Sequence, residues 1–249
     1  MKQYEAVVET MKRLGGIATL GQLYQEVFKL KECQWKTKTP FASVRRIVQQ
    51  TPKEIYKIKP GLYGLVSHRK QLEAQGFLVE TEKNRKSKAY VEFSHSYYQG
   101  LLLTMGNLKK LNTFAPAQDK NRKFMGTELG SIQTLPKIPP FSYERLVQRS
   151  STIDVIWFNA REMPHSFFEV EYSTDICNAL GKYMDLCDFN VRMIIVADAK
   201  RKMEYSDKIG REAYKTLRHP VSRVSFLDYD SLCRQYEREL ELQTCEVVL

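Results

Sequence analysis

Three acidic residues lie in two short apolar segments of this 249-residue chain. Asp154 belongs to the segment 153–158, and Glu169 and Glu171 belong to the segment 167–173. Side chains alternate along a strand, so Glu169 and Glu171 should share one face, and Asp154 can join them if the two strands pair as neighbours. Three such carboxylates would suit Mg²⁺, which prefers carboxylate oxygens and water and brings a scissile phosphate into the same shell.

An ordinary role for these acids has to be weighed as well. The segment 167–173 also fits a half-exposed strand whose glutamates face water. Asp154 is harder to explain in this way, because the rest of its segment is apolar and a buried carboxylate costs roughly several kcal/mol unless a partner compensates it. A local turn cap is the alternative for Asp154, whereas in a metal site Glu171 would orient or deprotonate the attacking water.

Composition narrows the class of protein. The chain is 43% hydrophobic and 27% charged, which is typical of a globular protein with one large domain or two ordinary ones. Its five cysteines form no CxxC pair, which argues against a zinc ribbon and a disulfide scaffold. Reduced thiols and the lack of a signal peptide predict a cytoplasmic protein. The longest apolar run, at 101–103, is too short to span a membrane.

The net charge of +10 is concentrated in the first third of the chain. Residues 1–90 contain 18 lysines and arginines against 8 aspartates and glutamates, whereas residues 91–249 contain 21 of each kind. A charge excess confined to one module favours binding to a polyanion such as DNA, because each neutralised phosphate releases counterions. A lysine-rich surface that only confers solubility is the alternative.

Residues 1–70 are predicted to form a winged helix. Helical spacing predicts helices over 4–14, after Thr19 and from Thr39–Pro40 to 50, and a basic hairpin turns at Pro60–Gly61. The third helix would then enter the major groove of DNA, although winged helices also bind proteins. The side chains expected to contact DNA from its outward face and from the flanking segments are Lys36, Lys38, Thr39, Ser43, Arg45, Arg46, Gln49, Lys57 and Lys59.

The rest of the chain is predicted to be a linker region, 71–95, and an α/β domain, 96–249, with a central mixed sheet. The linker region holds a short helix and the apolar segments 77–80 and 89–93 around a polar loop. A helix over 96–111, weakened by two glycines, opens the domain. A long polar loop, 118–150, separates a first strand from the two acidic strands. Further helices are expected over 174–186, 200–217 and 230–242, with strands over 112–117, 191–197 and 224–227.

The first module resembles the HARE-HTH family, winged helices that are fused to restriction endonucleases and chromatin proteins. The stretches GGIAT (15–19), TPFASVR (39–45) and GLYGL (61–65) carry the resemblance, which covers about residues 3–67. It implies that double-stranded DNA is the partner of this module.

Residues 96–230 resemble the PD-(D/E)XK nuclease superfamily, in which an Asp-bearing strand is followed by a strand with [Asp/Glu]-x-Lys. The resemblance implies that Asp154 and Glu169 bind the metal and that Glu171 occupies the lysine position. Glutamate replaces lysine in some active restriction endonucleases of this superfamily, and no proline precedes Asp154 here, which the superfamily tolerates. Four further residues could assist at the site, namely Gln99 on the first helix and Ser173, Asn178 and Lys182 around the start of the helix after the second acidic strand.

These observations lead to one main hypothesis and two alternatives. The main hypothesis is a Mg²⁺-dependent endodeoxyribonuclease similar to type II restriction enzymes, serving restriction or phage defence. A homodimer would suit a symmetric recognition site. The first alternative is a DNA-binding regulator whose nuclease-like domain is inactive, because Glu171 replaces the lysine. The second is a protein-interaction module, which would show little salt dependence in any DNA binding.

Overall fold

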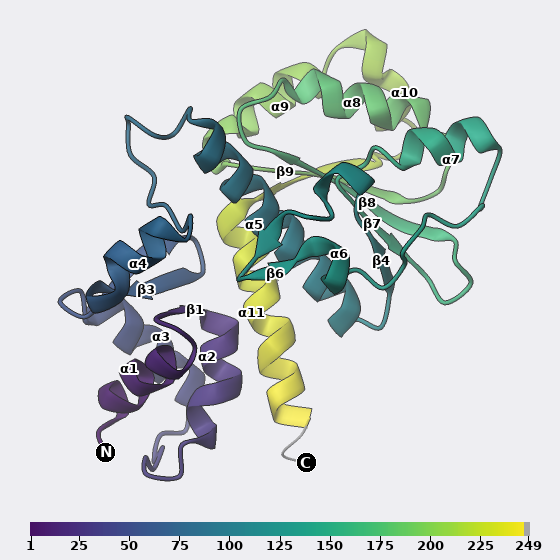
Figure 1. The fold of residues 1–249 in the computed structure, drawn as a ribbon. Coiled ribbons are helices and arrows are strands. Elements are labelled where there is room, and N and C mark those ends of the chain that lie inside the picture. Colours follow the sequence, from purple (N-terminus) through teal and green to yellow (C-terminus); the bar gives the residue numbers. More distant parts are fainter. Residues whose placement is uncertain (247–249) are drawn as a thin grey trace. The chain divides into compact units, whose positions relative to one another are not determined.

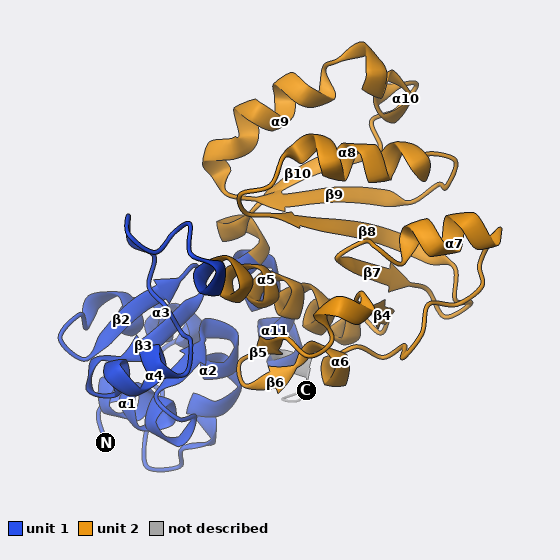
Figure 2. Cartoon of the chain, turned by 45° about the horizontal axis from the view of Figure 1, so that its top comes forward, with its two compact units in different colours: residues 1–90, 233–249 blue, residues 91–232 orange. Residues whose placement is uncertain are grey.

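The computed structural model describes residues 1–246, which form two compact units (Figures 1 and 2). The first unit contains Met1–Tyr90 together with the residues from Cys233 on, and the second contains Val91–Leu232. These limits differ from the boundaries that the sequence suggests. Residues 71–90 and the second part of the last helix belong to the first unit rather than to a linker and to the second domain.

The first unit contains the three helices and the hairpin that the sequence predicts. The helices are α1 (Gln3–Arg13), α2 (Leu20–Glu26) and α3 (Pro40–Gln50), followed by the short α4 (Arg69–Ala74). The strands β1 (Ile17–Thr19), β2 (Ile55–Lys59) and β3 (Leu62–Leu65) form an antiparallel sheet in the order β1-β3-β2. Thr19 caps α2 as expected, because its hydroxyl accepts a hydrogen bond from the Gln22 amide at 3.1 Å. The sequence did not indicate β1.

A five-stranded sheet forms the centre of the second unit. Its strands are β4 (Asn112–Phe114), β7 (Val155–Phe158), β8 (Pro164–Glu171), β9 (Arg192–Ala197) and β10 (Val224–Asp228). Their order is β10-β9-β8-β7-β4, with parallel pairing among β8, β9 and β10 and antiparallel pairing of β7 with both β8 and β4. The predicted α/β domain with a central mixed sheet is therefore confirmed.

Helices cover both faces of this sheet (Figure 1). On one face, α8 (Ile176–Asp185) packs its apolar side chains against Phe167, in a core that β7 and β9 share. On the other face lies α5 (Lys88–Leu108), whose Leu102 carbonyl accepts a hydrogen bond from the Trp157 indole at 2.9 Å. The remaining helices are α6 (Leu129–Ile132), α7 (Glu144–Ser150), α9 (Lys202–Ile209), α10 (Lys215–Arg218) and α11 (Tyr229–Glu246).

The structure corrects several local predictions. The helix expected over 96–111 is α5, which begins at Lys88, inside the predicted linker region, and ends at Leu108. The glycines of α5 lie at close approaches: a Cβ on Gly100 would be 2.1 Å from Phe124, and one on Gly106 would be 2.4 Å from Thr113. Dense packing thus accounts for residues that weaken a helix on propensity alone.

The structure also differs from the prediction in two longer segments. The loop 118–150 contains the short strands β5 (Lys123–Phe124) and β6 (Thr127–Glu128) as well as α6 and α7. The helix expected over 200–217 is broken between α9 and α10.

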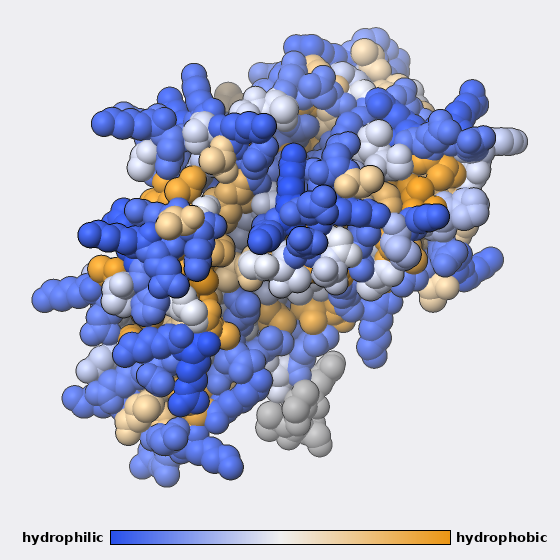
Figure 3. Space-filling model, viewed as in Figure 1, coloured by the Kyte–Doolittle hydropathy of each residue, from blue (hydrophilic) through white to orange (hydrophobic). Residues whose placement is uncertain are grey.

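Hydrophilic side chains cover most of the face drawn in Figure 3. No described helix is both long and apolar enough to cross a membrane.

Candidate active site

The two acidic strands pair as neighbours, which is the condition under which Asp154 can join the two glutamates. Val155 of β7 lies opposite Phe168 of β8, so that Asp154, directly before β7, comes beside Glu169. All three carboxylate residues are buried, with exposed fractions of 9% for Asp154, 2% for Glu169 and 4% for Glu171. Buried carboxylates require compensating partners, and the partner differs for each of the three.

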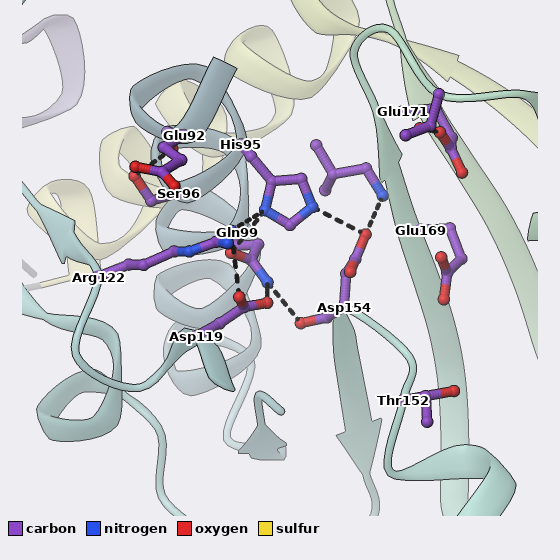
Figure 4. Close-up of polar contacts among 12 residues, drawn as sticks. Glu92, His95, Ser96, Gln99, Asp119, Arg122, Thr152, Asp154, Glu169 and Glu171 are labelled. Atoms are coloured by element: carbon purple, nitrogen blue, oxygen red, sulfur yellow. Dashed lines mark hydrogen bonds and ion pairs between the residues drawn. The ribbon is translucent and has the colours of Figure 1, made fainter. Parts of the chain in front are cut away.

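Asp154 is held by the backbone of β8 and by a side chain of α5. Its Oδ2 atom accepts a hydrogen bond from the Val170 amide at 2.7 Å and lies 3.1 Å from Nε2 of His95 (Figure 4). Burial alone would raise the pKa of the Asp154 carboxyl, but the charge and the hydrogen bond of His95 outweigh it, and the pKa is lowered. Asp154 is therefore ionised at neutral pH.

Glu169 is paired with a lysine from the helix that follows. The Lys182 ammonium on α8 lies 3.0 and 2.8 Å from the two carboxylate oxygens of Glu169 and also donates to the Thr152 carbonyl at 2.9 Å. Burial and the neighbouring Asp154 charge raise the pKa of Glu169 well above its usual value, against the opposing effect of Lys182. The Lys182 ammonium is thus the compensating partner of this buried carboxyl group.

Glu171 lies at the end of β8 and accepts a hydrogen bond from the Thr174 hydroxyl. Its backbone carbonyl accepts hydrogen bonds from Arg201 at 3.3 Å and from Tyr229 at 3.1 Å, which fix the end of the strand. Burial and the Asp154 charge raise the pKa of the Glu171 carboxyl to about 7. A carboxylate with such a pKa can accept a proton near neutral pH.

One pocket of about 290 Å³ joins these groups. The side chains of Ser173 and Asn178, which the sequence singled out, are exposed at its edge. Gln99 is fully buried and donates to the Asp154 carbonyl at 3.1 Å. The remaining lining residues are Val91, His95, Asp154, Glu169, Val170, Glu171, Tyr172, Thr174 and Lys182.

The sequence did not reveal the role of His95. Its four histidines are scattered along the chain, so none of them indicated a site. The four-residue spacing of His95 and Gln99 would have placed both on one helical face, but only if α5 were known to extend back to Lys88. Asp119, in the long loop, also reaches this region, where its carboxylate accepts a hydrogen bond from Gln99 at 2.8 Å.

The donor set suits a hard divalent cation. Asp154 and Glu169 present buried carboxylate oxygens side by side, and Mg²⁺ is commonly held by one or two carboxylates together with water and substrate phosphates. Among the described residues, however, no three carboxylate, histidine or cysteine side chains are grouped as a metal-binding cluster. The expected convergence of Asp154, Glu169 and Glu171 on one ion is therefore not preformed. Glu169 is directed to Lys182 and Glu171 to Thr174.

The side chains expected to contact DNA fall into three groups in the first unit, which are buried, half-buried and exposed. The expectation that Ser43 and Lys59 face outward is wrong, because both are buried; the Lys59 ammonium donates to the Tyr90 hydroxyl at 2.6 Å. Arg45 is half-buried and pairs with Glu237 of α11 at 3.1 Å. The exposed members are Lys36, Lys38, Thr39, Arg46, Gln49 and Lys57.

A comparison with known families matches most of the chain. The model of the family described as the C-terminal domain of the Type II restriction enzyme NmeDI matches residues 77–247. This stretch includes the pocket and every residue that lines it. No curated protein and no solved structure matches the chain.

Proposed function

The chain belongs to the family of the Type II restriction enzyme NmeDI C-terminal domain, and from this membership and the site we propose that it is a Mg²⁺-dependent endonuclease. It cleaves double-stranded DNA in a restriction or phage-defence system. The observation that carries the proposal is the ammonium of Lys182 on Glu169, in a pocket shared with Asp154 and Glu171. Charged groups of both signs in one open pocket favour chemistry over a purely structural role.

Lys182 answers the strongest objection to activity. The PD-(D/E)XK pattern has a lysine where this chain has Glu171, and its absence favoured an inactive DNA-binding regulator. Here the Lys182 ammonium reaches the Glu169 carboxylate from α8, from a position eleven residues after Glu171. An ammonium 2.8 Å from Glu169 lies at the edge of the pocket where a scissile phosphate would meet the acids. The active-enzyme proposal is therefore preferred to the regulator.

Each polar side chain has a distinct role in this mechanism. Asp154 and Glu169 would hold Mg²⁺, which supplies Lewis acidity toward the phosphate and acidifies bound water. Glu171, with a pKa of about 7, would accept the proton of the water that attacks the phosphorus atom. The bond from phosphorus to the leaving sugar oxygen breaks as the new bond forms, and that oxygen takes a proton from solvent. The Lys182 ammonium offsets the negative charge that grows on the phosphate oxygens.

The first unit would supply DNA binding. Its element order, three helices followed by the hairpin β2–β3, with β1 between the first two helices, supports the proposal of a winged helix. Lys38, Arg46 and Lys57 are exposed before α3, on α3 and on β2, and they can contact phosphates. The positive charge of residues 1–90 acts in the same direction.

The direct test is cleavage of plasmid and phage DNA, with and without base modification, in Mg²⁺ buffer. Wild type should cut at least one substrate, and Asp154→Ala and Glu169→Ala should leave it intact. Asp207→Ala serves as a matched control, since Asp207 is an exposed acid of α9 and should not affect cleavage. If wild type leaves every substrate uncut while still binding DNA, the endonuclease proposal fails and the regulator takes its place.

A further inference from the structure

The Asp154 carboxylate is held through only one of its two oxygens. Oδ2 accepts the Val170 amide at 2.7 Å and faces Nε2 of His95 at 3.1 Å. No described residue forms a hydrogen bond or an ion pair with Oδ1 of this pocket-lining side chain. Two donors on one oxygen fix the rotation of the carboxylate and leave the other oxygen to the pocket.

His95 is itself held from behind. Its Nδ1 atom lies 3.0 Å from Oε1 of Gln99 and 3.2 Å from a guanidinium nitrogen of Arg122 (Figure 4). The imidazole therefore has a polar contact at each of its two nitrogens, and these contacts hold its orientation. A carboxylate at Nε2 requires the proton on that nitrogen, so His95 donates to Asp154.

The residues behind His95 form a buried network that ends at the long loop. The amide nitrogen of Gln99 donates both to Oδ2 of Asp119 at 2.8 Å and to the Asp154 carbonyl at 3.1 Å. Asp119 is 2% exposed and pairs with Arg122 at 3.1 Å. Gln99 thus links the imidazole, the loop and the main chain that carries the carboxylate. Such a satisfied network is rigid, because each member fixes the next.

We propose that His95 is a positioning residue for divalent-cation binding: it holds the Asp154 carboxylate so that Oδ1 points into the pocket. The proposal rests on the endonuclease proposal for the identity of the site, but it concerns a residue outside the Asp-Glu-x-Glu pattern. Groups that orient metal ligands in this way typically contribute about 10- to 100-fold in metal affinity. His95 need not touch the substrate for this role.

The test measures binding of Mn²⁺, as a probe for Mg²⁺, to the full-length protein by calorimetry in the absence of DNA. His95→Ala should weaken Mn²⁺ binding about tenfold or more. His95→Gln keeps a side-chain N–H donor and should recover part of the loss. His165→Ala is the matched control, because His165 is the second residue of β8, near the opposite end of the strand from Glu171. It should bind Mn²⁺ like wild type.

Unfolding of the metal-free variants by urea separates positioning from general damage. If His95→Ala is as stable as His165→Ala but binds Mn²⁺ less well, the proposal holds. Wild-type affinity in folded His95→Ala, or in His95→Phe should the alanine variant not fold, together with lost binding in Asp154→Asn, overturns the positioning role and leaves the endonuclease proposal intact. Absence of Mn²⁺ binding in wild type, with no cleavage in Mg²⁺, overturns both.

Discussion

At the scale of single residues, the chemistry depends on where positive charge meets the buried acids. Lys182 compensates Glu169, whereas within residues 1–246 the Glu171 carboxylate accepts a side-chain hydrogen bond from the Thr174 hydroxyl alone. The pKa values of the two glutamates are both raised, chiefly by burial. The two acids nevertheless differ in use: one carboxylate remains beside a fixed cation, and the other can exchange a proton near neutral pH.

Replacing Lys182 should therefore abolish most of the activity. We expect Lys182→Met to lower the single-turnover cleavage rate about 100-fold or more, because a fixed charge that stabilises the reacting phosphate is lost. DNA affinity should change little, since one ammonium in a pocket adds little to binding by an exposed basic surface. Lys200→Met removes an exposed lysine of the same unit and should cleave normally. Cleavage by Lys182→Met within threefold of wild type would contradict the assigned role.

The second residue-scale prediction concerns the buried Lys59. Burial lowers the pKa of its ammonium to about 7, although the nearby Glu80 partly opposes this. The unfolded chain then binds more protons than the folded chain between about pH 7 and the usual lysine pKa. Wild-type stability should therefore gain up to about 1.4 kcal/mol per pH unit across that window from this group. Below pH 7 both states are protonated and the gain disappears.

Lys59→Met removes this pH dependence. Urea unfolding of both proteins at pH 6, 8 and 9 gives the difference between their free energies of unfolding at each pH. Relative to its value at pH 6, this difference should shift in favour of wild type at pH 8 and further at pH 9. Lys57→Met is the control, because Lys57 is exposed on the same strand. If the difference in the free energy of unfolding stays constant from pH 6 to pH 9, the pKa of the Lys59 ammonium is not lowered in the folded protein.

At the scale of elements, the part of α11 from Cys233 on completes the first unit although it comes last in the chain. Tyr236 and Leu240 of this helix are buried, and a Cβ on Gly21 of α2 would be 2.1 Å from Leu240. Glu237 of α11 lies 3.1 Å from Arg45 of α3. The helix that the sequence proposes for DNA therefore has one of its arginines fixed internally. This leaves the neighbouring positions, such as Arg46, to face outward.

This contact predicts a stability effect for Arg45 rather than a DNA-binding effect. Arg45→Ala leaves the nearly buried Glu237 carboxylate without its partner and should lower the free energy of unfolding by about 1–2 kcal/mol. The loss should be smaller than for a fully buried pair, because the Arg45 side chain is 41% exposed. Adding Glu237→Gln should restore part of it. Equal stability of Arg45→Ala and wild type in urea unfolding would disprove a structural role for the pair.

At the scale of the whole molecule, the sequence predicts what local pattern and composition determine. Apolar periodicity located the main helices and the acidic strands, and strand alternation indicated that Glu169 and Glu171 share a face. The partners of these acids come from elsewhere: His95 is 59 residues before Asp154, and Glu237 is 192 residues after Arg45. Such contacts depend on tertiary packing, which no spacing in a single sequence encodes. Burial of Lys59 escaped prediction for the same reason.

The division of the chain into two units predicts that binding and cleavage can be separated. Arg46→Ala combined with Lys57→Ala removes two exposed charges of the first unit, so DNA affinity should fall about tenfold and the salt slope of binding by about 2. At saturating protein, the single-turnover cleavage rate should stay within about threefold of wild type. Asp154→Asn should show the opposite behaviour, with no cleavage and unchanged or tighter binding, because a negative charge near the phosphate is lost.

Fluorescence anisotropy with a 30-base-pair duplex at several salt concentrations measures the first effect, and single-turnover cleavage measures the second. Arg13→Ala is the control for charge alone, because Arg13 is an exposed arginine of α1 that pairs with Glu9. If Arg13→Ala lost as much DNA affinity as the double variant of Arg46 and Lys57, only net charge would matter. The surface formed by α3 and the hairpin β2–β3 would then not be the DNA-binding surface. Loss of DNA binding in Asp154→Asn would show instead that the second unit supplies the affinity.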